Sequence, residues 1–190
     1  MANYTEDQRA AILNLILRSK DAPVKGVQRF KDGGLPHYYL TDGFVVVDSL
    51  SPLTPETERL PKSVARVAVR PPRETLVKFQ NRLKEFYAAM RSPLPLPPAC
   101  KLKQMAERQE KTGKPVVIRF PDGHHINPYY LLSAVRVCGK GCRAMTSGNP
   151  LAPILVYSDD YDLSAYVFPV HPAIISPETK LVDWPNVNIA

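Results

Sequence analysis

The stretch that decides the fold is PVVIRFPDGHHINPYYLLSAVRVCGKGCRAMT, residues 115–146. Its first six residues favour a strand, and Pro121-Asp122-Gly123 favours a turn. Asn127 predicts a helix N-cap, because its side chain can accept from free backbone N–H groups and Pro128 suits the first helical position. We expect this helix to run through residues 129–137 and to be followed by strands at residues 142–146, 154–157 and 163–168.

The same order, a helix and then strands, occurs at the start of the chain. Thr5 and Gln8 form a capping box, and the apolar residues that follow recur at helical spacing: Ala11, Ile12, Leu15 and Ile16. Short antiparallel strands are predicted at residues 27–31, 37–40 and 44–47. Two such half-repeats, residues 1–49 and 115–171, can lay both helices on one face of an antiparallel sheet, which predicts an α+β fold.

Residues 50–114, between the half-repeats, form a proline-rich and basic insertion. A strand is predicted at residues 64–69, and amphipathic helices are predicted at residues 73–91 and 100–112. Residues 70–114 hold 11 basic and four acidic residues, whereas the rest of the chain holds 14 of each. The net charge of +7 therefore belongs to the insertion.

A localised basic patch is the usual footprint of a polyanion partner, and a pair of solvated helices is the alternative. We interpret the two helices and the spacer between them as an insertion or an arm. If it contacts DNA, the expected phosphate contacts are Arg73, Lys78, Arg82 and Lys84 on the first helix, and Lys101, Lys103 and Arg108 on the second.

Length and composition restrict the class of protein to which the chain can belong. With 190 residues and 44% hydrophobic residues, the chain predicts one domain with a real core. Its N-terminus lacks a signal pattern, and no apolar run approaches the roughly 20 residues that span a bilayer. Cys100, Cys138 and Cys142 are too few for a disulfide framework, so we expect a reduced, cytoplasmic protein. Residues 172–190 are expected to be irregular, with Trp184 fastening them to the body.

Four blocks of sequence carry a resemblance to a known family. They are LTDGFVV at residues 40–46, INPYYLLSAV at 126–135, NPLAPILV at 149–156 and LSAYVFPV at 163–170. Their order and approximate spacing resemble the C-terminal domain of the bacterial DNA polymerase sliding clamp, the beta subunit. Residues 50–115 match nothing in that family.

The resemblance implies a DNA-clamp-like fold and a function. In a ring of six such domains the helices line the hole for duplex DNA, which is held through non-specific phosphate contacts. The ring recruits DNA-processing proteins by short hydrophobic peptides. We therefore expect a sliding-clamp-like, DNA-associated scaffold or processivity-type protein that is not an enzyme and needs no cofactor. A homo-oligomer is one assembly that the resemblance allows. The alternative is a protein-interaction module that has kept the clamp fold and no longer encircles DNA.

The resemblance also implies a peptide pocket. One wall carries the matches Asn127, Tyr130, Leu151, Pro153, Val167, Phe168, Pro169 and Val170. The opposite wall carries Thr41, Gly43 and Val46. In the family the two walls belong to neighbouring domains, so a complete pocket is expected to need a head-to-tail neighbour. The final strand is one residue shorter than the family's, and His171 occupies a position where the family has a basic residue.

Other motifs point less strongly to a functional site. His124-His125 and Cys138-x3-Cys142 suggest zinc, but adjacent histidines rarely face one ion and no fourth ligand is evident. The acidic turn Asp159-Asp160-x-Asp162 lacks a full calcium loop. No catalytic motif surrounds the histidines. The proline tract 93–98 can be a polyproline ligand or a stiff spacer, and the spacer is the preferred interpretation.

Overall fold

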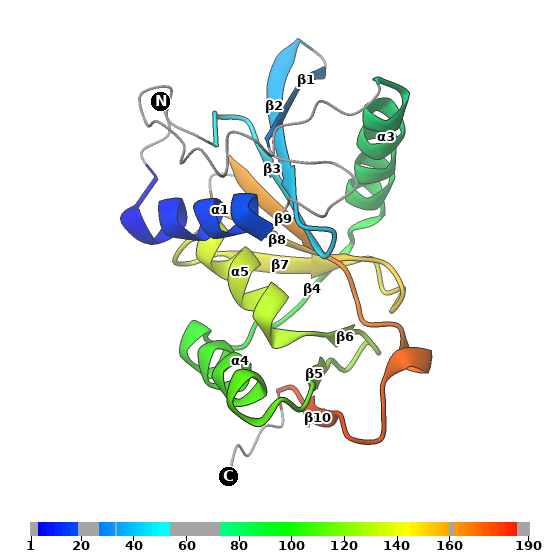
Figure 1. The fold of residues 1–190 in the computed structure, drawn as a ribbon. Coiled ribbons are helices and arrows are strands. Elements are labelled where there is room, and N and C mark those ends of the chain that lie inside the picture. Colours follow the sequence, from blue (N-terminus) through cyan, green and yellow to red (C-terminus); the bar gives the residue numbers. More distant parts are fainter. Residues whose placement is uncertain (1–3, 19–26, 33, 54–72, 160–161, 186–190) are drawn as a thin grey trace.

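The computed structural model describes residues 4–18, 27–32, 34–53, 73–159 and 162–185 (Figure 1). Within these ranges the fold is α+β, with four α-helices and a large antiparallel sheet. The helices are α1 (Glu6–Arg18), α3 (Arg73–Ala89), α4 (Ala99–Thr112) and α5 (Pro128–Cys138). None of them is long and apolar enough to span a membrane.

The large sheet joins two helix-and-strand units. The first is α1 with β1 (Gln28–Asp32), β2 (Leu35–Thr41) and β3 (Val45–Ser49), and the second is α5 with β7 (Arg143–Thr146), β8 (Ile154–Tyr157) and β9 (Leu163–Val167). The strand order is β1-β2-β3-β9-β8-β7-β4, so the last strand of each unit pairs with the last strand of the other. That pairing is antiparallel and sets Val45 opposite Val167.

Local signals place both helices of the repeat. Thr5 Oγ1 accepts from the Gln8 backbone N–H at 3.2 Å, and Gln8 Oε1 accepts from the Thr5 N–H at 2.9 Å, which completes the capping box. Asn127 Oδ1 accepts from the Tyr129 N–H at 2.9 Å, as the N-cap prediction requires. The two helices lie side by side on one face of the sheet (Figure 1).

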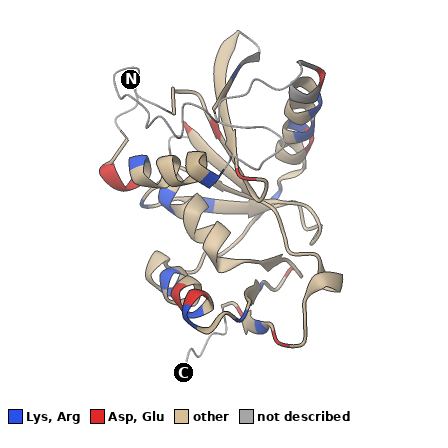
Figure 2. Ribbon diagram, viewed as in Figure 1, with Lys and Arg blue, Asp and Glu red and all other residues tan. Residues whose placement is uncertain are grey.

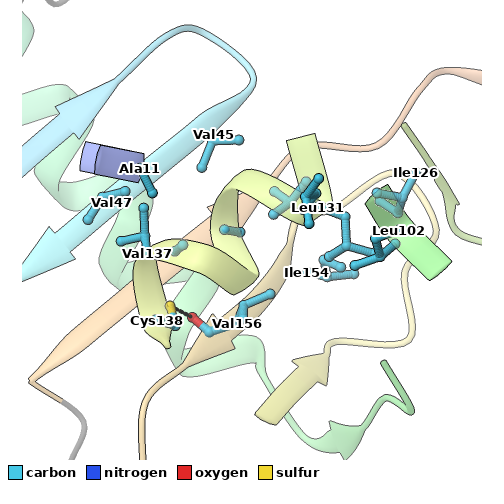
Figure 3. Packing of buried hydrophobic residues seen from close by; sticks show 14 of the residues in the cluster. Ala11, Val45, Val47, Leu102, Ile126, Leu131, Val137, Cys138, Ile154 and Val156 are labelled. Carbon is cyan, nitrogen blue, oxygen red and sulfur yellow. Dashed lines mark hydrogen bonds between the residues drawn. The ribbon is translucent and has the colours of Figure 1, made fainter. Parts of the chain in front are cut away.

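Alternation along the strands divides the buried residues between two faces. Val45, Val47 and Val167 face the core shared with α1, α4 and α5, part of which Figure 3 shows. Val46 and Tyr166 belong to a second cluster, which α3 covers from the other face. Because successive side chains of a strand point to opposite faces, neighbours such as Val46 and Val47 enter different cores.

The two insertion helices do not form a common arm, which leaves the insertion as the interpretation of this segment. α4 packs against α5 and buries Leu102, Met105 and Ala106 in the first core. α3 lies on the opposite face of the large sheet (Figure 1) and buries Leu83 in the second core. Each amphipathic helix instead buries its apolar face against a separate apolar surface of the body. The strand predicted at residues 64–69 lies outside the described residues.

The proline tract between these helices is a spacer held by the body. Ser92–Pro93 forms β4 and pairs antiparallel with β7. Leu94 is buried, and its N–H donates to the Ala144 carbonyl at 2.9 Å. The tract therefore adds to the edge of the sheet, which supports the spacer interpretation.

The segment after residue 172 is more regular than its prolines suggested. β10 (Lys180–Asp183) pairs in parallel with β5 (Val116–Arg119), which also pairs with β6 (His125–Ile126). Arg119 Nη2 donates to Asp183 Oδ2 at 2.9 Å. Trp184 Nε1 donates to the Pro95 carbonyl at 3.0 Å, so the expected anchoring role of Trp184 is confirmed. Within residues 172–185, the expectation of an irregular tail is wrong.

Candidate functional site

A hollow in the described surface lies between α3 and the sheet. On α3 four residues fall on one face at i, i+3, i+4 and i+7: Phe79, Arg82, Leu83 and Phe86. Opposite them lie the β7–β8 connection, through Asn149, Leu151 and Ala152, and Phe168 just after β9. Together these eight residues line a pocket of about 410 Å³. That volume lies within the usual range for a small-ligand or side-chain pocket.

Aromatic contacts fix α3 above the sheet. The Phe86 ring meets Phe168 edge to face with centroids 5.8 Å apart, and Phe79 meets Tyr39 in the same way at 5.9 Å. Such pairs add stabilisation beyond the burial of their area. The walls of the pocket are therefore mainly apolar carbon.

Arg82 is the charged residue at the rim of this pocket. Its guanidinium lies 5.0 Å from the centroid of the Phe86 ring, and its Nη1 lies 3.2 Å from Glu85 Oε2. Both charged side chains are about two-thirds exposed, at 68% and 65%. The guanidinium thus sits on an aromatic face at the edge of an apolar hollow.

The opposite wall is held by a buried histidine. His124 is completely buried, with Nε2 at 3.0 Å from the Ala152 carbonyl oxygen and Nδ1 at 2.8 Å from Asp122 Oδ2. Asn149 supports the same turn, because its Oδ1 accepts from the Leu151 N–H at 3.0 Å. These contacts give His124 a structural role behind the pocket wall.

The zinc hypothesis gains nothing from this arrangement. Across the ranges that the structure describes, no three His, Cys, Asp or Glu side chains gather to hold a metal ion. Cys138 is buried and its Sγ donates to the Val156 carbonyl at 3.4 Å.

Two of the eleven predicted peptide-binding residues, Leu151 and Phe168, line the pocket. Four others are buried and cannot reach a ligand without rearrangement: Thr41, Val46, Pro153 and Val167. Val46 and Val167 lie on opposite faces of the sheet. The structure therefore does not assemble the predicted set into one surface.

The remaining predicted residues gather elsewhere. Tyr130, in the first turn of α5, stacks on Phe44 with ring centroids 4.5 Å apart and planes at 13°. Gly43 lies in the turn beside Phe44, at a φ of +94° that favours glycine. Asn127 caps α5, and Pro169 and Val170 follow Phe168, with the Val170 N–H donating to the His125 carbonyl at 2.7 Å.

The Thr-Asp-Gly turn and the start of α5 thus meet within a single chain. Phe44 also accepts a hydrogen bond from the Phe168 N–H at 3.0 Å through its carbonyl oxygen. Arg18 Nη2 lies 2.9 Å from Asp42 Oδ2, and the Arg18 guanidinium lies 4.8 Å from the centroid of the Tyr129 ring. Burial, followed by the nearby Asp42 carboxylate, raises the pKa of Tyr130. These contacts join α1, the turn and α5 without a neighbouring copy.

The predicted DNA contacts are divided between two surfaces (Figure 2). Lys78, Arg82 and Lys84 lie on α3, and Lys101, Lys103 and Arg108 lie on α4. Arg73 begins α3, and its side chain is outside the described part. Each helix carries four basic and two acidic residues, so each holds a surplus of only two positive charges. Separation of the helices by the sheet leaves no single patch.

Sequence reasoning missed most of the pocket lining. The stripe containing Phe79, Leu83 and Phe86 is visible in the sequence, but it indicates only that one face of a helix is apolar. Asn149 and Ala152 fall inside a block that resembles the clamp family, next to the predicted Leu151 and Pro153. The missing information was that α3 would come to lie against this turn.

Comparison of the chain with models of protein families, with curated proteins and with solved structures gave no significant match.

Proposed function

We propose that this protein is a non-enzymatic interaction module, built on a clamp-like repeat, that binds short apolar peptide segments of partner proteins. The observation that carries the proposal is the pocket between α3 and the turn that includes Leu151. Its lining offers aromatic and aliphatic carbon together with a few polar groups at the edge, which suits apolar side chains of an extended segment.

The exposure of the lining supports a docking role. Leu151 is 54% exposed at the mouth of the pocket, whereas Phe168 and Phe86 are half-buried at its walls. An apolar side chain that is already fixed in place loses little conformational freedom on binding. The aromatic pairs beneath the pocket provide that fixed surface.

The clamp-like part of the proposal rests on the repeat. Two helix-and-strand units meet at the β3–β9 pairing, and their helices lie on one face of the sheet. This is the arrangement that the resemblance to the sliding clamp implies, and the four resembling blocks lie within these units. α3 is an addition that covers the other face.

Fluorescence anisotropy with a short labelled peptide tests the proposal. The probe has a Leu-Phe centre between Ser and Gly residues, and the control peptide has Ala-Ala at its centre. Truncation with Leu151→Ala should weaken binding about fivefold, because partial burial of a leucine is worth about 1 kcal/mol. The matched variant Ile174→Ala removes another exposed aliphatic side chain, 73% exposed and outside the pocket lining, and should bind as the wild type does. Equal binding of the two peptides would refute the proposal.

DNA association is a second candidate, favoured by the position of α4. Lys101, Lys103 and Arg108 lie on α4, which packs beside α5. In the family that the chain resembles, the helices of the repeat face DNA. A triple charge removal, K101Q/K103Q/R108Q, should abolish binding to a duplex at low salt, and wild-type affinity should fall steeply with added salt. Light scattering with and without duplex tests assembly, since a strict monomer in both samples rules out a ring.

A further inference from the structure

We infer that the peptide segment bound by the pocket is acidic as well as apolar, and that Arg82 recognises its carboxylate. This inference rests on the proposed function, because it names the chemistry of the partner at the same site. Arg82 lines the pocket together with apolar residues, so a group bound in the hollow lies next to its side chain.

The geometry of Arg82 suits a carboxylate at the rim. Its guanidinium is supported by the Phe86 ring at 5.0 Å and already lies 3.2 Å from the Glu85 carboxylate. An arginine has five N–H donors in a planar fork, and one contact with Glu85 leaves donors for a second carboxylate. Because Glu85 is 65% exposed, an incoming acid can also replace it without disturbing the core.

The surrounding charge favours the same ligand. Lys78 precedes Arg82 by one helical turn, which sets it on the same side of α3, and it is exposed. α3 as a whole holds four basic residues and two acidic ones. A peptide that carries Asp or Glu next to a large apolar side chain would place the apolar group among Phe79, Leu83 and Phe168 and its charge beside Arg82.

The occupant is a segment of another protein rather than a second copy of this chain. The chain has a formal net charge of +7, so two copies repel each other at low salt, while an acidic segment is attracted. Charge complementarity therefore selects the class of partner, and the apolar hollow supplies the contact area.

The test compares three labelled peptides that share the Leu-Phe centre and differ in its neighbours, which are Asp, Asn or Lys. Wild-type protein should bind the Asp peptide about twofold to fivefold more tightly than the Asn peptide at low salt, and the Lys peptide least tightly. Arg82→Glu should reverse this order. Arg136→Glu makes the same charge change on an exposed residue of α5, and should keep the wild-type order.

A second variant keeps the inference falsifiable if Arg82→Glu folds poorly. Glu85→Gln removes the competing carboxylate, and the preference for Asp over Asn should then increase. If wild-type protein binds the Asp and Asn peptides equally, the inference about charge fails while the proposed function stands. If none of the peptides binds, the proposed function fails too. A doubled mass that Leu151→Ala returns to monomer would identify a second copy as the occupant and overturn the inference.

Discussion

Replacement of His124 by leucine should lower the free energy of unfolding by about 1–3 kcal/mol. The imidazole is completely buried and lies within hydrogen-bond distance of Asp122 Oδ2, at 2.8 Å, and of the Ala152 carbonyl oxygen, at 3.0 Å. Leucine fills a similar volume but offers no donor. A neutral imidazole carries one N–H, so leucine removes one hydrogen bond, at about 1–3 kcal/mol where the acceptor is left buried without a partner.

Urea unfolding measures this effect as a shift of the midpoint at constant slope. His171→Leu is the matched control, because His171 is exposed and its Nδ1 accepts from the Ala173 N–H at 3.2 Å. We expect that control to change stability by less than about 1 kcal/mol. His124→Gln should recover part of the loss, since its amide can donate to the Ala152 carbonyl.

The same substitutions separate a general loss of stability from a local one. Ala152 lines the pocket, and loss of its contact with His124 should displace the turn. The His124→Leu variant should therefore bind the apolar peptide more weakly, even at temperatures where it remains folded. His124→Gln should retain more of the affinity. A His124→Leu protein with wild-type stability would refute the role of this hydrogen-bonded histidine, whatever its peptide affinity.

Three further predictions concern other parts of the fold. Asn127→Ala removes the cap of α5 and should cost about 0.5–2 kcal/mol in urea unfolding, with a wild-type result contradicting the cap. Leu102→Ala should cost about 2–5 kcal/mol, because it opens a cavity between α4 and α5, whereas an arm held away from the body would tolerate it. The pKa of Asp183 is lowered by its hydrogen bond with Arg119, so this contact stabilises β10 at neutral pH and is lost as pH falls below about 4. Trp184 emission should report that loss, and Asp183→Asn should remove the pH dependence.

The elements of the repeat could be predicted because their signals are local. A capping box at Thr5 and an N-cap at Asn127 mark where helices begin, and both bonds are present in the structure. The strands of the second unit follow from turns rich in Gly, Asn and Pro. Each of these features depends on residues a few positions apart, so the sequence alone contains them.

The site was harder to predict because it depends on contacts between distant segments. An apolar stripe indicates that α3 buries one face, but it does not say which side of the sheet receives that face. The register that sets Val45 opposite Val167 also lies outside local sequence. That register turns Val46 and Val167 to opposite faces, and so separates residues that the resemblance had placed in one pocket.

α3 belongs to the core of the domain, even though it lies in a segment without resemblance to the clamp family. Leu155, Tyr157 and Tyr166 are buried on the face that α3 covers, in the same cluster as Leu83. Burial raises the pKa of the Tyr166 hydroxyl, in keeping with a site closed to solvent. Without α3 this face would expose a contiguous apolar surface, which soluble monomers rarely tolerate. The pocket exists where α3 and the turn that includes Leu151 leave part of that surface open, so the same apolar face that holds the helix also supplies the proposed binding site.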